Sequence, residues 1–154
     1  MPLTDIIAPN AILPALKVNN KKQVIQELAA HAAKLTGLNE RTILEVLQQR
    51  ERLGSTAVGS GVAIPHGKLP KLGGLFGLFA RLEKPIDFEA LDNQKVDLVF
   101  LLLAPEGAGA DHLKALAKIA RLLRDPEIAR KLRASRDADA LYSVLKLTPA
   151  SSAA

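Results

Sequence analysis

The segment Gly59–Lys68 reads GSGVAIPHGK and places a histidine between a proline and a glycine. The three residues before the proline, Val62–Ile64, are small or β-branched, which favours a short strand. Pro65 lacks a backbone N–H and fixes its own φ, so we expect the strand to end there. Gly67 has no Cβ, so the backbone can bend sharply or another group can come close. The segment therefore predicts that His66 is presented at a turn that follows a strand.

Two amphipathic helices are expected before this segment. Asn19 or Asn20 is expected to cap the first helix, in which apolar residues recur at steps of three and four, and Gly37 marks its end. Asn39 is expected to cap the second helix, which stops at Gly54. His31 lies beside the apolar stripe of the first helix and is interpreted as a surface or boundary histidine.

Three further strands are expected around these helices. Ile12–Val18 alternates weakly, and Pro14 restricts it to a sheet edge, while Met1–Asn10 is expected to be a loosely packed lead-in. Leu75–Leu82 is a strand candidate with glycines at its start. Val96–Ala104 reads VDLVFLLLA, a nearly continuous apolar run that is typical of a central strand covered on both faces.

The remaining segments predict loops and three helices. Glu83–Lys95 is expected to be a turn-rich connection. Asp111 or a neighbour begins a helix after the glycine-rich loop, Pro126 fits the first residue of a second helix behind an Asp125 cap, and Asp137–Leu147 gives a last helix. The side of the first of these helices that we expect to be buried carries Leu113, Leu116, Ala117, Ile119, Ala120 and Leu123.

Helices and short apolar strands come in runs and do not alternate strictly. This order predicts an α/β fold with one domain over residues 1–147, in which α-helices sandwich a mixed β-sheet. Residues 148–154, TPASSAA, are expected to form a disordered tail.

Composition narrows the possible functions. The chain has no cysteine, which excludes disulfides and thiolate chemistry and favours a cytoplasmic location. Its N-terminus lacks the pattern of a signal peptide, and its longest apolar run, Leu98–Pro105, is too short to cross a bilayer. The net charge of +5 raises the question of nucleic acid, but four Phe and one Tyr offer few stacking platforms. We therefore expect neither nucleic-acid binding nor membrane insertion, and we interpret the basic region Arg121–Arg136 as a solvated helical face.

Two histidines stand at the ends of expected elements. His66 follows a strand, and His112 follows the exit loop of the central strand and opens a helix. Ligands of α/β proteins bind at the loops beyond strand ends, so the two imidazoles face one site if the loops are neighbours. In the other interpretation, His112 is only a residue at a helix start and has no functional role. Both interpretations of His112 stay open.

The surroundings of these histidines favour an anion. A helix start offers free N–H groups, and a glycine-rich turn can point its amides inward as a nest. Candidate phosphate-binding groups, together with the cations Arg50 and Lys68, are Ser55, Thr56, Gly59, Ser60 and Gly61.

A phosphoryl group carried on a ring nitrogen is consistent with this set. The accepting imidazole must be neutral, and surrounding donors stabilise the charge of the transition state. No cofactor is implied, and a metal is not expected, because Asp111 and His112 are adjacent at a helix start and do not easily point at one ion.

Two blocks of the sequence resemble the enzyme IIA components of the bacterial phosphotransferase system, in the mannitol, fructose and nitrogen-regulatory family. They are RERLGSTAVGSGVAIPHGKL (Arg50–Leu69) and VDLVFLLLAPEGAGADHLKALAKIARLL (96–123), and the resemblance extends from about Thr4 to Leu147. It implies that His66 of the IPHG motif accepts a phosphoryl group from a small histidine phosphocarrier protein. It also implies that His112 is the second histidine of the family's site and that Arg50 contacts the phosphoryl group or a partner. The family fold is a mixed sheet sandwiched by helices.

The segment LGSTAVGSGVAIPHGKL (53–69) is most similar to the nitrogen-regulatory branch of this family. Similarity to that branch implies that the protein is the last member of a regulatory phosphoryl relay. Its phosphorylation state would then control proteins such as potassium transporters or sensor kinases. One alternative is a fructose- or mannitol-type component that passes the phosphoryl group to an enzyme IIB during sugar uptake. An alternative from another class is a non-catalytic protein-binding module.

Overall fold

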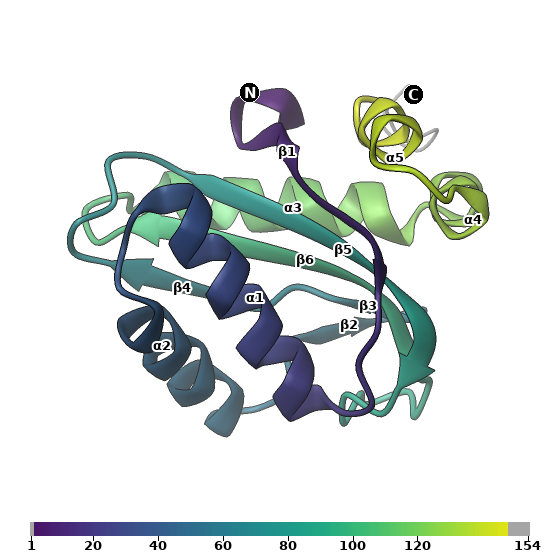
Figure 1. Ribbon diagram of the computed structural model, residues 1–154, viewed down its shortest axis with the longest axis horizontal. Helices are drawn as coiled ribbons and strands as arrows, with labels where there is room; N and C mark the ends of the chain where they lie inside the picture. The colour runs from purple at the N-terminus through teal and green to yellow at the C-terminus, as the bar shows by residue number, and fades with distance from the viewer. Residues whose placement is uncertain (1, 148–154) are drawn as a thin grey trace.

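A mixed sheet of six strands runs through the protein, and the computed structural model describes residues 2–147 (Figure 1). The strand order is β1-β5-β6-β3-β2, with β4 also paired to β6. The strands are β1 (Ile7–Leu16), β2 (Ala57–Gly59), β3 (Val62–Ala63), β4 (His66–Leu69), β5 (Phe76–Ile86) and β6 (Val96–Pro105). The predicted α/β fold with a mixed sheet is confirmed, whereas the expected tail at 148–154 lies outside the described residues.

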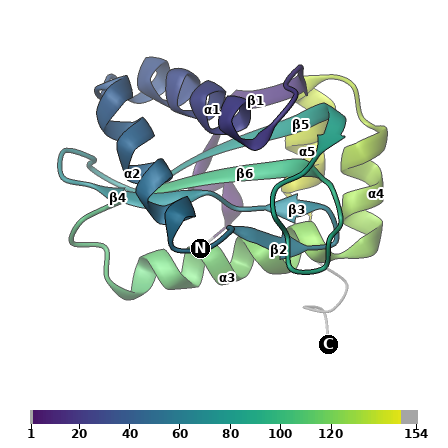
Figure 2. The same ribbon diagram turned by 90° about the horizontal axis from the view of Figure 1, so that it is seen from below.

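Helices cover both faces of this sheet. In Figures 1 and 2, α1 and α2 lie on one face and α3 lies along the other, and α4 and α5 follow α3 and pack against β6 and β1. The helices are η1 (Leu3–Asp5, a 3-10 turn), α1 (Lys21–Thr36), α2 (Glu40–Arg52), α3 (Ala110–Arg124), α4 (Pro126–Ala134) and α5 (Ala138–Leu145).

Side-chain caps begin four of the helices. Asn20 accepts from the backbone of Gln23, and Asn39 accepts from Thr42, so the predicted caps of α1 and α2 are confirmed. Asp125 caps α4, with Pro126 as its first residue, as the sequence predicted. Asp137 caps α5 in the same way.

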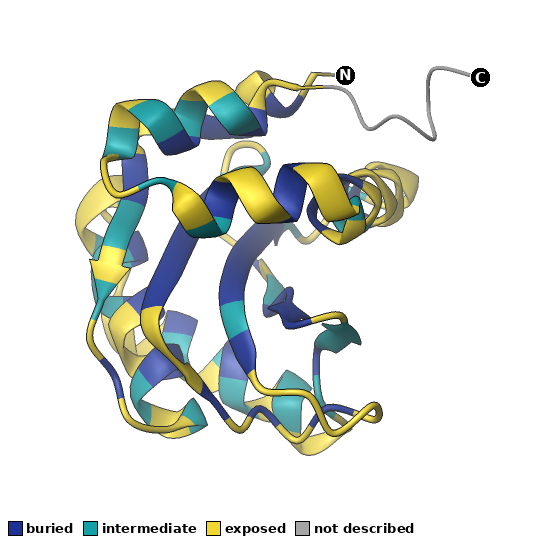
Figure 3. Ribbon diagram, turned by 90° about the vertical axis from the view of Figure 1, so that its right-hand side faces the viewer, coloured by how far each residue is buried: buried dark blue, intermediate teal, exposed yellow. Residues whose placement is uncertain are grey.

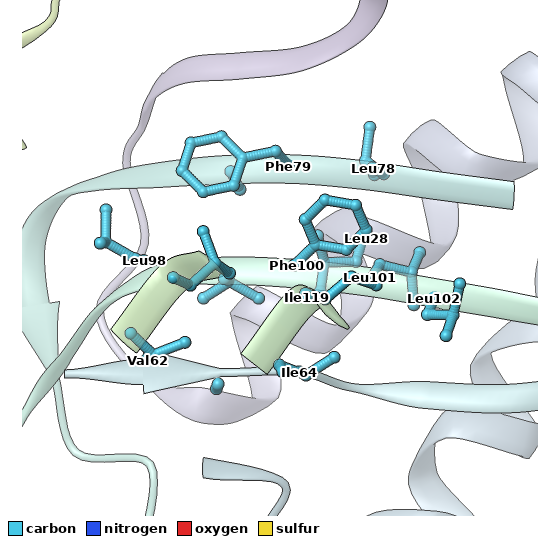
Figure 4. Packing of buried hydrophobic residues seen from close by; sticks show 14 of the residues in the cluster. Leu28, Val62, Ile64, Leu78, Phe79, Leu98, Phe100, Leu101, Leu102 and Ile119 are labelled. Atoms are coloured by element: carbon cyan, nitrogen blue, oxygen red, sulfur yellow. The ribbon is translucent and has the colours of Figure 1, made fainter. Parts of the chain in front are cut away.

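The central position of β6 follows from its composition. It pairs antiparallel with β5 and parallel with β3 and β4, and its residues from Leu98 to Ala104 are fully buried. Figure 4 shows this core, where Phe79 and Phe100 lie on neighbouring strands and Ile119 comes from α3. In Figure 3 the buried sides of the helices face the sheet and their exposed sides face outward.

Two expectations about the strands are wrong. The lead-in is not loosely packed, because β1 already begins at Ile7 and its apolar neighbours Leu3 and Ile6 are buried in the core. β5 continues through Pro85 to Ile86, well into the expected loop. The pairing between β5 and β6 shifts register between Arg81 and Ile86, so the ladder tolerates a residue without an N–H there.

The buried side of α3 differs from the expected one by a small rotation. Leu113 is 68% exposed, whereas the residues that face the core are His112, Ala115, Ile119, Leu122 and Leu123. The prediction counted only apolar side chains and so left the histidine out of the inner face. The helix also begins behind Gly109, whose φ of +56° suits glycine, and the structure shows no side-chain cap from Asp111.

Candidate functional site

His66 is the first residue of β4 and does not lie in a turn, which corrects the expectation from the sequence. The chain runs on past Pro65 as an interrupted strand, since β3 and β4 both pair parallel with β6. The carbonyl of Pro65 still accepts a hydrogen bond from Leu102 at 2.9 Å. The missing N–H of the proline therefore interrupts the strand without turning the chain.

The His66 ring is held by one of its two nitrogens. Nδ1 lies 2.8 Å from the carbonyl oxygen of Ile64, and a carbonyl only accepts, so Nδ1 carries the proton. In the neutral ring Nε2 then carries the lone pair. Burial lowers the pKa of His66, and the charge of Arg50 lowers it further, against the opposing effects of the Ile64 bond and of Glu51. The ring is therefore neutral at physiological pH.

His112 lies beside His66. The two ring centroids are 5.5 Å apart and the planes meet at 62°, so the structure brings the two histidines together at the start of α3. His112 is buried, and its Nε2 has no hydrogen-bond partner among the residues that the structure describes. Burial, followed by the nearby His66 and Lys68, lowers its pKa. A buried ring nitrogen without a partner is uncommon and suits a group that awaits a ligand.

A hollow of about 320 Å³ opens beside His66. Arg50 reaches it from the end of α2, where its Nη1 also donates to the carbonyl of Gly54 at 2.9 Å. The opposite wall comes from α3. Its remaining lining residues are Ser55, Thr56, Ala57, Val58, Ile64, Leu116, Ala117 and Ala120. We call His66, His112, Arg50 and this hollow the histidine site.

The hydroxyls of Ser55 and Thr56 line the hollow but are bonded elsewhere. Ser55 Oγ donates to the carbonyl of Phe88 at 2.6 Å, and Thr56 Oγ1 donates to Glu51. Glu51 also accepts from the Thr56 backbone at 3.1 Å and pairs with Lys21 at 3.0 Å. These bonds fix the wall of the hollow to α1 and α2.

The turn Gly59–Gly61 is not part of this site. The backbone N–H of Ser60 donates to Asp92 at 3.0 Å, and its carbonyl accepts from Arg133 at 2.9 Å. Arg133 also donates to Asp97 at 2.9 Å. We call Ser60, Asp92, Asp97 and Arg133 the hairpin cluster.

The hairpin cluster lies at the other end of β6. Gly61 accepts from the backbone of Asp97 near the start of β6, whereas His66 pairs with Leu102. The four-residue step from Leu98, which also donates to Gly61, to Leu102 corresponds to about 13 Å along a strand. The structure therefore does not bring the Gly59, Ser60 and Gly61 amides to the histidines.

Two further residues shape the site; the sequence indicated the close approach at Gly67, whereas it gave no sign of the role of Glu51. A Cβ on Gly67 would lie 2.3 Å from Val46 Cγ1, so the missing side chain lets α2 pack directly on β4. The expectation of a close approach at Gly67 gave this signal in part. Glu51 is nearly buried, with 8% of its side chain exposed, but in the sequence it resembles an ordinary solvated residue near a helix end.

Two other properties of the described part of the chain bear on function. Within residues 2–147, no three His, Cys, Asp or Glu side chains gather where they could hold a metal ion. No helix in the same range has the length and apolar character needed to cross a membrane.

Comparisons with known proteins agree with this architecture. The family model described as "Phosphoenolpyruvate-dependent sugar phosphotransferase system, EIIA 2" matches residues 5–147. The nitrogen regulatory protein of Bradyrhizobium diazoefficiens is 76% identical over 153 residues, which cover 99% of this chain and 100% of that protein. The crystal structure of nitrogen regulatory protein IIA-Ntr from Neisseria meningitidis matches with a TM-score of 0.88 at 33% identity, covering 93% of this chain and 98% of that one.

A sugar-specific relative matches differently. The fructose-specific EIIABC component of Bacillus subtilis is 33% identical over 146 residues, which cover 94% of this chain but only 23% of that protein. The similarity thus falls on one part of a much longer chain.

Proposed function

This chain belongs to the enzyme IIA type 2 family of the phosphotransferase system, and on that premise we propose that it accepts a phosphoryl group on Nε2 of His66 from a histidine phosphocarrier protein. The observation that carries the proposal is the hydrogen bond from Nδ1 to Ile64. It leaves the Nε2 lone pair of His66 available, beside a His112 nitrogen that has no hydrogen-bond partner among residues 2–147. A neutral imidazole with one fixed nitrogen is the form that a nucleophile requires.

The transfer step balances without an added proton. The Nε2 lone pair of His66 forms the new N–P bond while the bond from phosphorus to the donor's ring nitrogen breaks and leaves its electron pair on the donor. Nδ1 keeps its proton, so the His66 ring gains the positive charge that the donor's ring loses. The Ile64 carbonyl, 2.8 Å from Nδ1, stabilises this charge.

His112 and Arg50 have supporting roles in this proposal. With a proton on Nε2, His112 donates to a phosphoryl oxygen, which gives its buried nitrogen the partner that the described residues do not provide. Arg50, whose charge already acts on His66, contacts the phosphoryl group or the rim of a partner. Ser55 and Thr56 hold the wall of the hollow through their bonds to Phe88 and Glu51.

A regulatory role is favoured over a role in sugar transport. The relative with 76% identity over its full length is a nitrogen regulatory protein, whereas the fructose-specific relative shares only the region that matches this chain. We therefore propose that partner proteins, such as potassium transporters or sensor kinases, respond to the phosphorylation state of His66. Delivery of the group to an enzyme IIB remains the alternative, because the same open Nε2 serves either acceptor.

The test is a labelling assay. The protein is incubated with enzyme I, the phosphocarrier and phosphoenolpyruvate, and acid-labile phosphate is measured. We expect label on the wild type and on His31→Ala, and none on His66→Ala. Full labelling of His66→Ala would overturn the assignment. Transfer of the label onward to a sugar-specific enzyme IIB would favour the transport alternative.

A further inference from the structure

A buried carboxylate lies behind one wall of the histidine site. Glu51, in the last turn of α2, exposes only 8% of its side chain. It accepts hydrogen bonds from the backbone N–H of Thr56 at 3.1 Å and from the Thr56 hydroxyl, and its Oε1 lies 3.0 Å from Lys21 Nζ. A buried ion pair adds little to stability by itself, because removing both charges from water offsets their attraction. The place of Glu51 beside the histidine site therefore calls for a functional explanation.

Hydrogen bonds connect Glu51 to the ring of His66. Glu51 holds Thr56 through its backbone N–H and its hydroxyl, and the carbonyl oxygen of Thr56 accepts from the backbone N–H of Ile64 at 3.0 Å. The carbonyl oxygen of Ile64 in turn accepts from Nδ1–H of His66 at 2.8 Å. We call Glu51, Thr56, Ile64 and His66 the carboxylate chain. The position of the Ile64 carbonyl, and with it the tautomer and orientation of the His66 ring, therefore depends on Glu51.

The carboxylate of Glu51 is itself held from α1 and from the loop after β5. The ammonium of Lys21 lies 3.9 Å from Oε2 of Glu89 and 4.9 Å from the centre of the Phe88 ring, in addition to its contact with Glu51. Ser55 fixes the same loop, because its hydroxyl donates to the Phe88 carbonyl at 2.6 Å. These contacts fix the negative charge of Glu51 in place before any phosphoryl group arrives.

Charged and titratable groups surround His66 on three elements. They are Arg50 and Glu51 on α2, His112 on α3 and Lys68 on β4. The neighbouring strand β6 pairs with His66 through the apolar Leu102. Burial and the charge of Arg50 lower the pKa of His66, and the charge of Glu51 acts in the opposite direction. Glu51 therefore favours a positive charge on this ring.

We propose that Glu51 is a positioning residue for phosphoryl transfer, which places the Ile64 carbonyl through Thr56 and stabilises the positive charge of the phosphorylated His66 ring. The proposal rests on the function proposed above, in which Nδ1 keeps its proton and the ring becomes a cation. A buried carboxylate near this ring favours the cation, because little water screens the attraction. Arg50, the preceding residue, suits the phosphoryl oxygens, so two consecutive residues of α2 act on opposite charges.

The Nδ1 proton decides how readily His66 passes its phosphoryl group on. When the N–P bond breaks, its electron pair returns to Nε2, and a ring that has kept the Nδ1 proton leaves as neutral imidazole. A ring that has lost this proton to solvent must leave as an imidazolate anion, which is a much poorer leaving group. By favouring the protonated ring, Glu51 extends to higher pH the range in which the phosphorylated protein delivers its group.

The test follows delivery of the phosphoryl group from the phosphorylated protein to an excess of unphosphorylated phosphocarrier, by rapid quench between about pH 6 and pH 9. The variant is Glu51→Gln, which keeps the size of the side chain and one carbonyl acceptor but removes the charge. The matched control is Glu89→Gln, which removes an exposed carboxylate that also approaches Lys21 but lies outside the carboxylate chain. Dividing each rate by the wild-type rate at the same pH cancels the titration of the phosphocarrier. Thermal melting checks that each protein is folded.

For Glu51→Gln we expect delivery within about twofold of the wild type near pH 6 but at least about fivefold slower near pH 9, because the phosphorylated ring loses its Nδ1 proton at a lower pH. Glu89→Gln should follow the wild type throughout. Long-range ¹H–¹⁵N spectra of the phosphorylated proteins should show a lower Nδ1 pKa in Glu51→Gln alone. Equal pH profiles and equal Nδ1 titrations in all three proteins would overturn the proposal. Slowing by the same factor at every pH would also overturn it, since that result indicates structural damage without an effect of charge.

A second variant tests the carboxylate chain without changing Glu51. Thr56→Val removes the hydroxyl that donates to Glu51 but keeps the size of the side chain. Delivery should slow by about threefold to tenfold at every pH, because the Ile64 carbonyl is held less firmly, and Thr56→Ser should recover most of the rate. A wild-type rate for Thr56→Val would overturn the positioning role. Absence of label on His66 of the wild type would instead overturn the proposed function.

Discussion

The histidine site and the hairpin cluster lie near opposite ends of β6 and use their polar groups in opposite ways. In the hairpin cluster, Arg133 bonds to both Asp97 and Ser60, and Asp92 accepts from two backbone amides. In the histidine site, Nε2 of His112 has no partner among residues 2–147, and the pKa values of both histidines are lowered. Satisfied polar groups stabilise a fold, whereas unsatisfied ones close to each other mark a place where a ligand completes the bonding.

The largest difference between the two regions should appear when His112 is changed. His112→Ala should still accept label at His66, but transfer should slow by about tenfold to a hundredfold, because a donor to the shifting charge is lost. His112→Gln keeps a donor and should recover part of the rate. A rapid-quench time course measures all three proteins. If the three time courses overlapped, His112 would have no role in phosphoryl transfer and would only be a residue at the start of α3.

Gly67 tests the packing that supports the histidine site. Gly67→Ala places a Cβ 2.3 Å from Val46 Cγ1, so the Val46 side chain must leave its rotamer or α2 must move away from β4. We expect the free energy of unfolding to fall by about 1–3 kcal/mol, as for other overpacked cores. Urea denaturation measures this loss. Val46→Ala should restore much of it in the double variant, and an unchanged midpoint for Gly67→Ala alone would show that the contact is not tight.

Arg133 offers the converse test at the hairpin cluster. Arg133→Met removes the bonds to Asp97 and to the Ser60 carbonyl. The arginine is 38% exposed, so solvent screens the pair and we expect a loss of about 1 kcal/mol in stability. Because the cluster is remote from His66, kcat for phosphoryl transfer should not change. A large fall in kcat with a normal melting curve would contradict the conclusion that the hairpin cluster has no role in phosphoryl transfer.

Acid should weaken the fold through the histidine site. Both histidines have folded-state pKa values below 6.5, chiefly because of burial, so the unfolded chain binds protons first as pH falls. Their contribution to stability is complete above pH 6.5 and is lost as pH drops from 6.5 through the folded-state pKa values. Thermal melting between pH 8 and 5 should show this loss in the wild type and a smaller one in His66→Gln/His112→Gln. An equal loss in both proteins would place the proton uptake elsewhere.

Local chemistry made much of the fold predictable. The apolar run of β6 identified the central strand, and Asn20, Asn39 and Asp125 marked the starts of three helices. Both signals lie within a few consecutive residues and do not depend on contacts with distant parts of the chain. The inner side of α3 was less predictable, since a buried histidine breaks an apolar pattern. The IPHG segment pointed to His66, but its place in β4 depends on pairing with β6, a contact between distant segments.

The rest of the site depended on contacts that no local pattern encodes. A glycine-rich turn suits both an anion nest and a hairpin, and only the positions of Asp92 and Arg133 show that Gly59–Gly61 forms the hairpin. Glu51 is similar, because its burial arises where α1, α2 and Thr56 meet. Spacing in the sequence could not reveal either arrangement.

The identity of the phosphorylated nitrogen tests the central claim most directly. The Ile64 carbonyl holds Nδ1–H of His66 at 2.8 Å, so the phosphoryl group should form its bond to Nε2. A long-range ¹H–¹⁵N correlation spectrum of the ¹⁵N-labelled, phosphorylated protein distinguishes the two ring nitrogens. We expect the phosphorus-bonded nitrogen to be Nε2, with Nδ1 still protonated. A phosphoryl group on Nδ1, or on His112, would contradict the account.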